Sequence, residues 1–197
     1  MRFTKIPETT FSEIQLNAGV LLANFNPADG SFELTDIIGA TTGGVSFADP
    51  MTFTDFGEDI DNCPANMKEL KKLGTHEVTM SGTFVTVTAK TVKILIGVAD
   101  IASGNNTKVV PRNDLLGTDF TDIWWAGDYS DKNGETKGGY MAIHLMNALN
   151  TGGFKIQSTD KGKGQFAFSF MGHYSMSAQD TVPYEVYVKA GGAEAEG

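Results

Sequence analysis

The feature that most constrains the fold is an alternation of apolar and smaller residues with a period of two. It is clearest in 165–171, where Phe166, Phe168 and Phe170 fall on one face of an extended chain. Such a pattern predicts a strand that packs one face into a core. Residues 83–88 alternate in the same way. The further predicted strands are 19–25, 31–37, 44–47, 120–126, 139–146, 154–159 and 183–189.

Turn residues separate these strands. Asn-Pro-Ala-Asp-Gly at 26–30 predicts a tight connection, and Asp-Lys-Asn-Gly at 131–134 predicts a hairpin, because Asn-Gly tolerates the positive φ of a type I′ turn. Glycine supplies 23 of the 197 residues, more than the usual ~7%. A chain of this length buries a core without disulfides, which agrees with its single cysteine, Cys63.

Two segments have helical signals. Asn62 can cap a short helix that has Pro64 in its first turn and ends before Gly74. Residues 89–102 carry apolar side chains at helical spacing, although some of these also alternate as in a strand. We therefore predict a mainly β fold: a β-sandwich or barrel of antiparallel sheets, a flanking α-helix, and a long acidic connection over 47–75 that lacks a strand pattern.

Acidic residues are concentrated in the first third of the chain. No Lys or Arg lies between Lys5 and Lys68, whereas this stretch holds ten acids, and the whole chain has a net charge of −9. An acidic surface argues against a protein that binds the phosphate backbone of nucleic acid. A block of one sign is commonly a solvated face, but it also repels anions or attracts cations.

The residues that an enzyme needs do not form a recognisable pattern. The histidines lack the short spacing of metal sites, and the cysteine has no partner. The Gly-rich stretch 162–167 leads into a predicted strand, whereas a phosphate loop would lead into a helix. We therefore predict no enzyme, no cofactor and no metal, with a loose cation site at 58–62 left open. Neither a targeting segment nor a membrane span is expected.

Two adjacent tryptophans suggest a second class of function. Trp124 and Trp125 place one ring on each face of a predicted strand, so we expect one ring in the core and the other exposed. An exposed Trp on a β-sandwich is a possible sugar platform, which keeps a carbohydrate-binding module as an alternative. Aromatic residues are also enriched in the cores of subunit interfaces.

Several segments, taken in order over roughly 11–189, carry a resemblance to one family. They are Phe-Gly-Glu-Asp-Ile-Asp-Asn-Cys-Pro at 56–64, the predicted helix at 92–100, Phe-Thr-Asp-Ile-Trp-Trp-Ala-Gly-Asp-Tyr at 120–129, Ile-His-Leu-Met-Asn-Ala-Leu at 143–149 with Thr-Gly-Gly-Phe at 151–154, and Gly-Lys-Gly-Gln-Phe-Ala-Phe at 162–168. The chain resembles the major tail proteins, or tail tube proteins, of long-tailed phages that infect Gram-positive bacteria.

The resemblance implies a structural protein of the virion tail, made in the host cytoplasm. Such subunits form hexameric rings that stack into a hollow tube, with one sheet of each subunit lining a β-barrel lumen through which phage DNA passes without specific binding. Residues 1–189 would form the tail-tube domain, 47–75 the stacking loop with a short helix, and 190–197 a flexible tail. The implied partners are the tail terminator, tape-measure and distal tail proteins. A tube subunit of a phage-tail-like bacteriocin is an alternative.

The charges of the side chains suggest which residues line the lumen or take part in the contacts between subunits. A basic lumen would hold DNA and an acidic one would let it slide, so we expect some of the acids to line the lumen or the contact between rings. Lysines in a Gly-rich turn are expected to meet the acidic loop of a neighbouring ring. The acidic candidates are Glu33, Asp36, Asp55, Glu58, Asp59 and Asp61, and the inter-subunit candidates are Trp124, Trp125, Lys155, Lys161 and Lys163.

Overall fold

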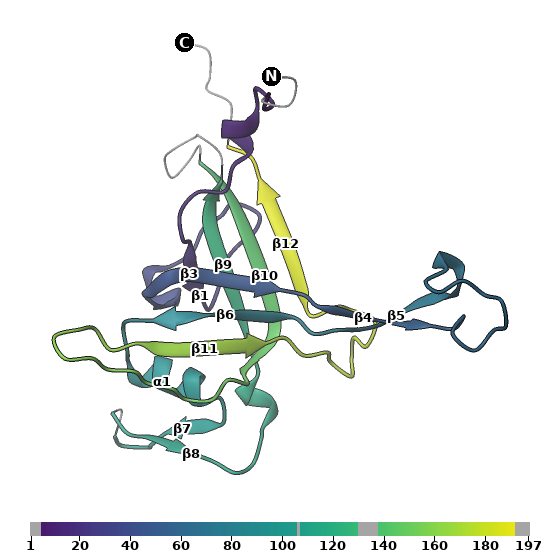
Figure 1. The fold of residues 1–197 in the computed structure, drawn as a ribbon. Coiled ribbons are helices and arrows are strands. Elements are labelled where there is room, and N and C mark those ends of the chain that lie inside the picture. Colours follow the sequence, from purple (N-terminus) through teal and green to yellow (C-terminus); the bar gives the residue numbers. More distant parts are fainter. Residues whose placement is uncertain (1–4, 106, 130–137, 192–197) are drawn as a thin grey trace.

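Two antiparallel sheets pack against each other in the computed structural model, which describes residues 5–105, 107–129 and 138–191 (Figure 1). The first sheet has the order β2 (Ile37–Gly39), β1 (Val20–Leu22), β9 (Thr121–Tyr129), β10 (Gly139–Asn150), β12 (Tyr184–Lys189). The second continues from the end of β10 through β11 (Phe166–Met171), β6 (Thr79–Phe84) and β3 (Thr41–Ala48). This confirms the predicted mainly β sandwich with a flanking helix.

Strand β10 belongs to both sheets because it is bent near its end. Its pairing with β9 shifts register between Leu145 and Ala148, and Asn147 within this bulge has a φ of 48°. Asparagine is among the few residues that tolerate this left-handed conformation. Asp122 Oδ1 accepts a hydrogen bond from the Asn147 backbone N–H at 2.9 Å, which holds the bulge. Beyond it, β10 pairs with β11.

The core lies between the two sheets and follows the predicted alternation. Phe166, Phe168 and Phe170 of β11 are all buried in it, together with Leu21, Trp125 and other residues of the first sheet. Gly82 lies directly opposite Phe168 in the register. A Cβ at Gly82 would come within 2.7 Å of the Phe168 ring, so the close packing of this ring requires glycine.

The flanking helix is α1 (Ala89–Ile96), which confirms the first half of the helix predicted over 89–102. Thr88 Oγ1 accepts a hydrogen bond from the Thr91 N–H at 3.2 Å, and Gly97, with a φ of 82°, ends the helix. The second half of that prediction is wrong. Residues beyond Gly97 form β7 (Ala99–Ile101), which pairs with β8 (Val109–Pro111).

Three other predictions about elements differ from the structure. Residues 31–37 form a turn and the 3-10 helix η2 (Leu34–Asp36), because the Asp36 carboxylate accepts the Glu33 N–H and caps it. Residues 154–159 make only an isolated bridge between Gln157 and Gln165. The alternation at 83–88 marks only the end of β6. Two further 3-10 helices are η1 (Thr10–Glu13) and η4 (Gly117–Asp119).

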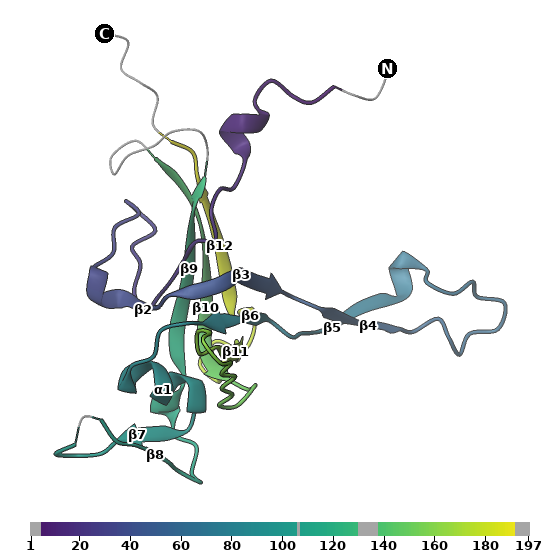
Figure 2. The same ribbon diagram turned by 60° about the vertical axis from the view of Figure 1, so that its left-hand side comes forward.

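The long connection over 47–75 is a β-hairpin rather than a loop with a helix. Strands β3 and β6 continue outward into β4 (Met51–Asp55) and β5 (Lys71–His76), which we call the arm, residues 51–76; it extends well away from the sandwich (Figures 1 and 2). The predicted helix from Asn62 is wrong. Asn62 and Asn66 have positive φ angles, only η3 (Lys68–Leu70) is helical, and β5 pairs with β4.

Two predictions fall on parts of the chain that are not described. The turn at 131–134 lies outside the described residues, although β9 and β10, which flank it, do pair antiparallel. Of the predicted C-terminal tail, residues 192–197 lie outside the described ranges.

Candidate functional site

The arm has one apolar face that nothing in the described chain covers fully. Phe53 and Leu73 lie directly opposite each other in the register and therefore share a face, on which Met51 precedes Phe53 by two residues. All three are exposed, Phe53 by 51%. Thr54 and Lys72 pair on the other face. An antiparallel hairpin with one apolar face normally buries that face, so the arm lacks a partner.

The tip of the arm, residues 56–70, adds further exposed apolar side chains. Phe56 is 60% exposed, and Ile60 and Met67 are also exposed. Together with Met51, Phe53 and Leu73 they form what we call the arm surface. A group of exposed large apolar side chains on one projecting segment is a candidate interaction surface.

Side chains from three strands hold the base of the arm. His76 Nδ1 lies 2.7 Å from Asp49 Oδ2, and the Tyr184 hydroxyl of β12 donates to the same oxygen at 3.1 Å. Phe47 packs against Tyr184 with ring centroids 5.1 Å apart. Burial, followed by the bond to Asp49, raises the pKa of Tyr184. These contacts join the arm to β12 and set its direction relative to the sandwich.

Asp55 organises the tip. Its Oδ1 accepts the Gly57 N–H at 2.9 Å, and its Oδ2 accepts the Asn66 N–H at 2.8 Å. The bond from Gly57, then that from Asn66, with a smaller contribution from the charge of Lys71, lowers the pKa of Asp55 below its ordinary 3.8. Asp55 therefore has a structural role that the sequence did not reveal.

The Asp55 bonds can be tested by hydrogen exchange. Because the folded pKa is lowered, the contribution of these bonds is fully present above pH ~3.8 and is lost as the pH falls through the lower folded value. We expect Asp55→Asn, which lacks the second acceptor oxygen, to speed exchange at Gly57 or Asn66 at neutral pH. Asp59→Asn, at an exposed neighbouring acid, is the control. Equal exchange in both variants would contradict the role of Asp55.

The structure separates the six acidic candidates into two sets. Glu58, Asp59 and Asp61 are exposed at the tip, beyond Asp55. Glu33 and Asp36 lie in and beside η2, on the segment before β2, which is on the other side of the body from the arm (Figure 2). Asp36 Oδ1 also accepts a hydrogen bond from the Asn24 amide at 2.8 Å. The acids of the N-terminal third therefore do not form one surface.

The prediction that one tryptophan is exposed is wrong. Trp124 and Trp125 are each only 8% exposed. Trp125 lies in the main core and its Nε1 donates to the Ala18 carbonyl at 2.9 Å. Trp124 lies on the opposite face, where Phe25 packs over it and His144 stacks on it with ring centroids 3.9 Å apart. Neither ring is available as a sugar platform or as a subunit contact in this conformation.

The three candidate lysines are exposed on the connection between β10 and β11, residues 151–165. Figure 1 shows this connection at the opposite end of the β3–β6–β11 sheet from the arm. Phe154 and Ile156 on the same connection are also exposed. The lysines in question are Lys155, Lys161 and Lys163.

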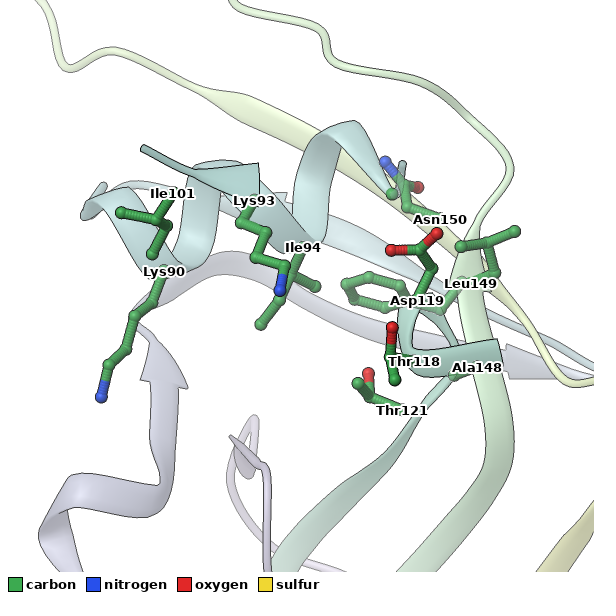
Figure 3. A pocket seen from close by; sticks show the side chains of 12 residues that line it. Lys90, Lys93, Ile94, Ile101, Thr118, Asp119, Thr121, Ala148, Leu149 and Asn150 are labelled. Atoms are coloured by element: carbon green, nitrogen blue, oxygen red, sulfur yellow. The ribbon is translucent and has the colours of Figure 1, made fainter. Parts of the chain in front are cut away.

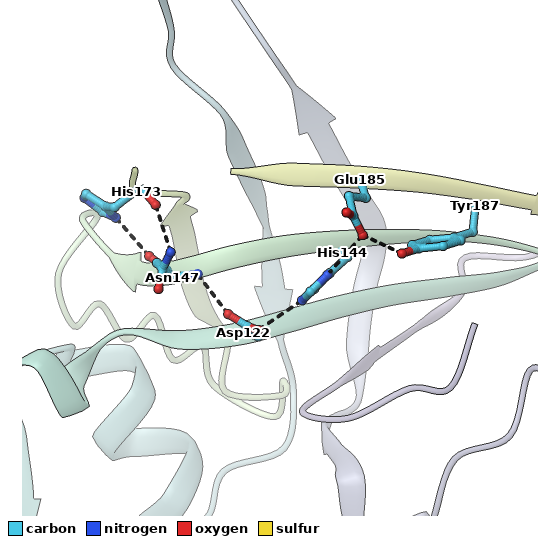
Figure 4. A network of polar contacts seen from close by, with 6 residues as sticks. All are labelled: Asp122, His144, Asn147, His173, Glu185 and Tyr187. Carbon is cyan, nitrogen blue, oxygen red and sulfur yellow. Dashed lines mark hydrogen bonds and ion pairs between the residues drawn. The ribbon is translucent and has the colours of Figure 1, made fainter. Parts of the chain in front are cut away.

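A polar network on β9, β10 and β12 accounts for His144 (Figure 4). His144 Nε2 lies 3.1 Å from Asp122 Oδ2, and its Nδ1 lies 3.7 Å from Glu185, which also accepts from the Tyr187 hydroxyl. The other oxygen of Asp122 holds the bulge at Asn147. The network therefore supports the bend of β10.

The described residues contain neither a cluster that could hold a metal ion nor a helix that could cross a membrane. Within 5–105, 107–129 and 138–191, no three His, Cys, Asp or Glu side chains are grouped closely enough to hold a metal ion. In the same ranges, no helix has the length and the apolar character needed to cross a membrane.

No protein-family model matches the chain, and none of the curated proteins is significantly similar to it in sequence.

Proposed function

We propose that the protein is a structural subunit that polymerises, as stacked hexameric rings, into the tail tube of a long-tailed phage and forms the channel for its DNA. The observation that carries this proposal is the arm surface. A projecting hairpin with exposed apolar side chains on one face would gain about 25 cal/mol for each Å² that a neighbour covers. In a homopolymer, the neighbour that covers the arm surface is a second copy of the chain.

The position of the arm favours an open or ring-forming assembly. The arm leaves the sandwich at one end of the β3–β6–β11 sheet (Figure 1), and in the proposed tube it contacts a different surface of the neighbouring copy. Contacts between two different surfaces generate rings when the rotation closes and filaments when it does not. A stack of rings uses closed contacts within each ring and open-ended contacts from one ring to the next.

The edges of the first sheet offer the contact within a ring. In the described residues, β12 pairs with β10 alone and β2 pairs with β1 alone, so each strand leaves one edge unpaired. Val186 and Val188 of β12 are also exposed. Pairing of β12 with an edge strand of the next subunit would remove an exposed edge and extend the sheet around the lumen.

DNA delivery, the partners and the location belong to the same proposal. A net charge of −9 suits a tube through which phage DNA moves without binding. The tube would end at the tail terminator and distal tail proteins and enclose the tape-measure protein, in a virion tail assembled in the host cytoplasm.

Two alternative functions remain to be compared with this proposal. A bacteriocin tube subunit would share this geometry, and the presence or absence of DNA in the purified particles distinguishes a virion tail from a bacteriocin. The carbohydrate-binding alternative loses its basis because both tryptophans are buried.

Negative-stain electron microscopy of the purified protein tests the proposal. We expect rings or hollow tubes, and a sedimentation coefficient that rises with protein concentration because polymerisation follows mass action. A stable monomer across the whole concentration series, with no rings in the images, would contradict the proposed function.

A further inference from the structure

A cavity of about 280 Å³ lies between α1, η4 and the end of β10 (Figure 3). Its apolar lining comes from Ile94, Ile101, Ala148, Leu149 and Phe170. Asp119 and Asn150 also line it, but both are already bonded: Asp119 pairs with Arg112 and accepts the Leu116 N–H, and Asn150 bonds the backbone around it. The inner part of the cavity is therefore apolar, with its polar groups satisfied.

The mouth of the cavity has polar groups without partners. Lys93 is half-buried, and Figure 3 shows its ammonium group pointing toward the space in front of Thr118 and Thr121, with Lys90 further out on the same helix. Across the described ranges, none of these four side chains has a hydrogen bond or an ion pair. Ammonium groups that no carboxylate of the described residues neutralises can pair with an anionic partner.

The nearby fixed charges leave the mouth positive. Arg112 Nε lies 2.6 Å from Asp100 Oδ2, and the same guanidinium pairs with Asp119. Arg112 is the cation that contacts both carboxylates, Asp100 and Asp119. With Lys90 and Lys93 included, three positive charges stand against two negative charges, which leaves one positive charge in excess. The cavity therefore suits an apolar side chain that is flanked by carboxylates.

The tip of the arm carries a side chain of this description. Ile60 is 51% exposed and stands between Asp59 and Asp61 in the chain. The turn that presents it is fixed by two backbone bonds, from Ile60 N–H to the Gly57 carbonyl at 3.2 Å and from Cys63 N–H to the Ile60 carbonyl at 3.1 Å. A tip that is already ordered loses little conformational freedom on docking.

We propose that Ile60 of one copy inserts into the cavity between α1 and β10 of a second copy, with Asp59 and Asp61 facing Lys90 and Lys93. The inference rests on the proposed function and adds the surface that receives the arm. Figures 1 and 2 show the arm and α1 in different parts of the molecule, so the contact joins two copies. The connection 151–165 is the competing receiver. It is a protruding segment with exposed lysines, where ion pairs contribute little.

A charge exchange tests this contact. Lys90→Glu/Lys93→Glu and Asp59→Lys/Asp61→Lys each place like charges together, so we expect each to raise the concentration needed for polymerisation at least about tenfold. The chain with all four substitutions restores opposite charges and is expected to polymerise like the wild type. The control, Lys155→Glu/Lys161→Glu/Lys163→Glu, is expected to polymerise normally. Circular dichroism and thermal melting of each variant verify that it is folded.

The outcomes separate this inference from the proposed function. If the wild type forms no rings or tubes, the proposed function fails. If the wild type polymerises and the cavity variant does so equally well, the cavity is not the receiver. If the loop variant is the defective one, and combining it with Asp59→Lys/Asp61→Lys restores tubes, the connection 151–165 receives the arm and the proposal for the cavity is overturned.

Discussion

Replacing Phe53 and Phe56 by serine is expected to raise the concentration needed for polymerisation strongly and to leave the monomer folded. Both side chains are at least half exposed in the single chain, so their loss removes little from the core. In a polymer each would be covered by a neighbour. Fully burying one Phe contributes about 1.5–3 kcal/mol, and only about half of each ring is still exposed, so the loss of both would raise the critical concentration by roughly ten- to a hundredfold.

A matched variant shows whether the arm, rather than apolar exposure in general, is responsible. Leu34→Ser/Met176→Ser removes two side chains that are even more exposed, at 81% and 90%, but lie outside the arm. We expect this variant to form tubes in electron micrographs and to sediment like the wild type. Equal loss of polymer in both variants would show that the arm has no special role, and unchanged polymerisation of Phe53→Ser/Phe56→Ser would show that its apolar face is not an interface.

Phe84→Ala is expected to lower the free energy of unfolding by about 3–5 kcal/mol, because it leaves a cavity in the main core. Phe84 is fully buried, packs against Phe168 with ring centroids 4.6 Å apart, and lies opposite Phe166 on β11 and Thr41 on β3. This cost is a large part of the 5–15 kcal/mol by which domains are usually stable. Urea unfolding followed by circular dichroism measures it.

Polymerisation would shift the apparent stability, so the measurement belongs in the Phe53→Ser/Phe56→Ser background, which we expect to be monomeric. Phe32→Ala is the control, because that ring is 43% exposed and its loss should cost less than about 1 kcal/mol. A loss for Phe84→Ala no larger than that of the control would mean that the two sheets do not enclose the core described here.

Prediction of the elements succeeded where the local pattern and the burial have the same period. The three phenylalanines of β11 alternate in sequence and are all buried, since a strand with one packed face must alternate. The predicted helix from Asn62 failed for a reason outside its own segment. The local capping signals are present, but pairing of β5 with β4 supplies backbone hydrogen bonds along Lys71–His76 that a helix would break.

Prediction of the candidate site was partial. The acidic run of the arm was visible in the sequence, and Glu58, Asp59 and Asp61 are indeed exposed together at the tip. The apolar arm surface was missed, although the pairs Met51 with Phe53 and Leu73 with Thr75 show a weak alternation that could have suggested a hairpin. The cavity beside α1 had no sequence signal, because its lining comes from α1, β7, η4, β9, β10 and β11.

The sequence by itself determined that the chain is mainly β, where β1, β3, β9, β10, β11 and β12 lie, and that the acids gather in the first third. Those properties depend on spacing within one segment, which residue order fixes directly. Only the tertiary structure decided that Trp124 is covered by Phe25 and His144, that the six acids separate into two sets, and that Phe53 remains half exposed. Burial of a strand face depends on which distant segment packs over it, and the residues of a single strand do not identify that segment.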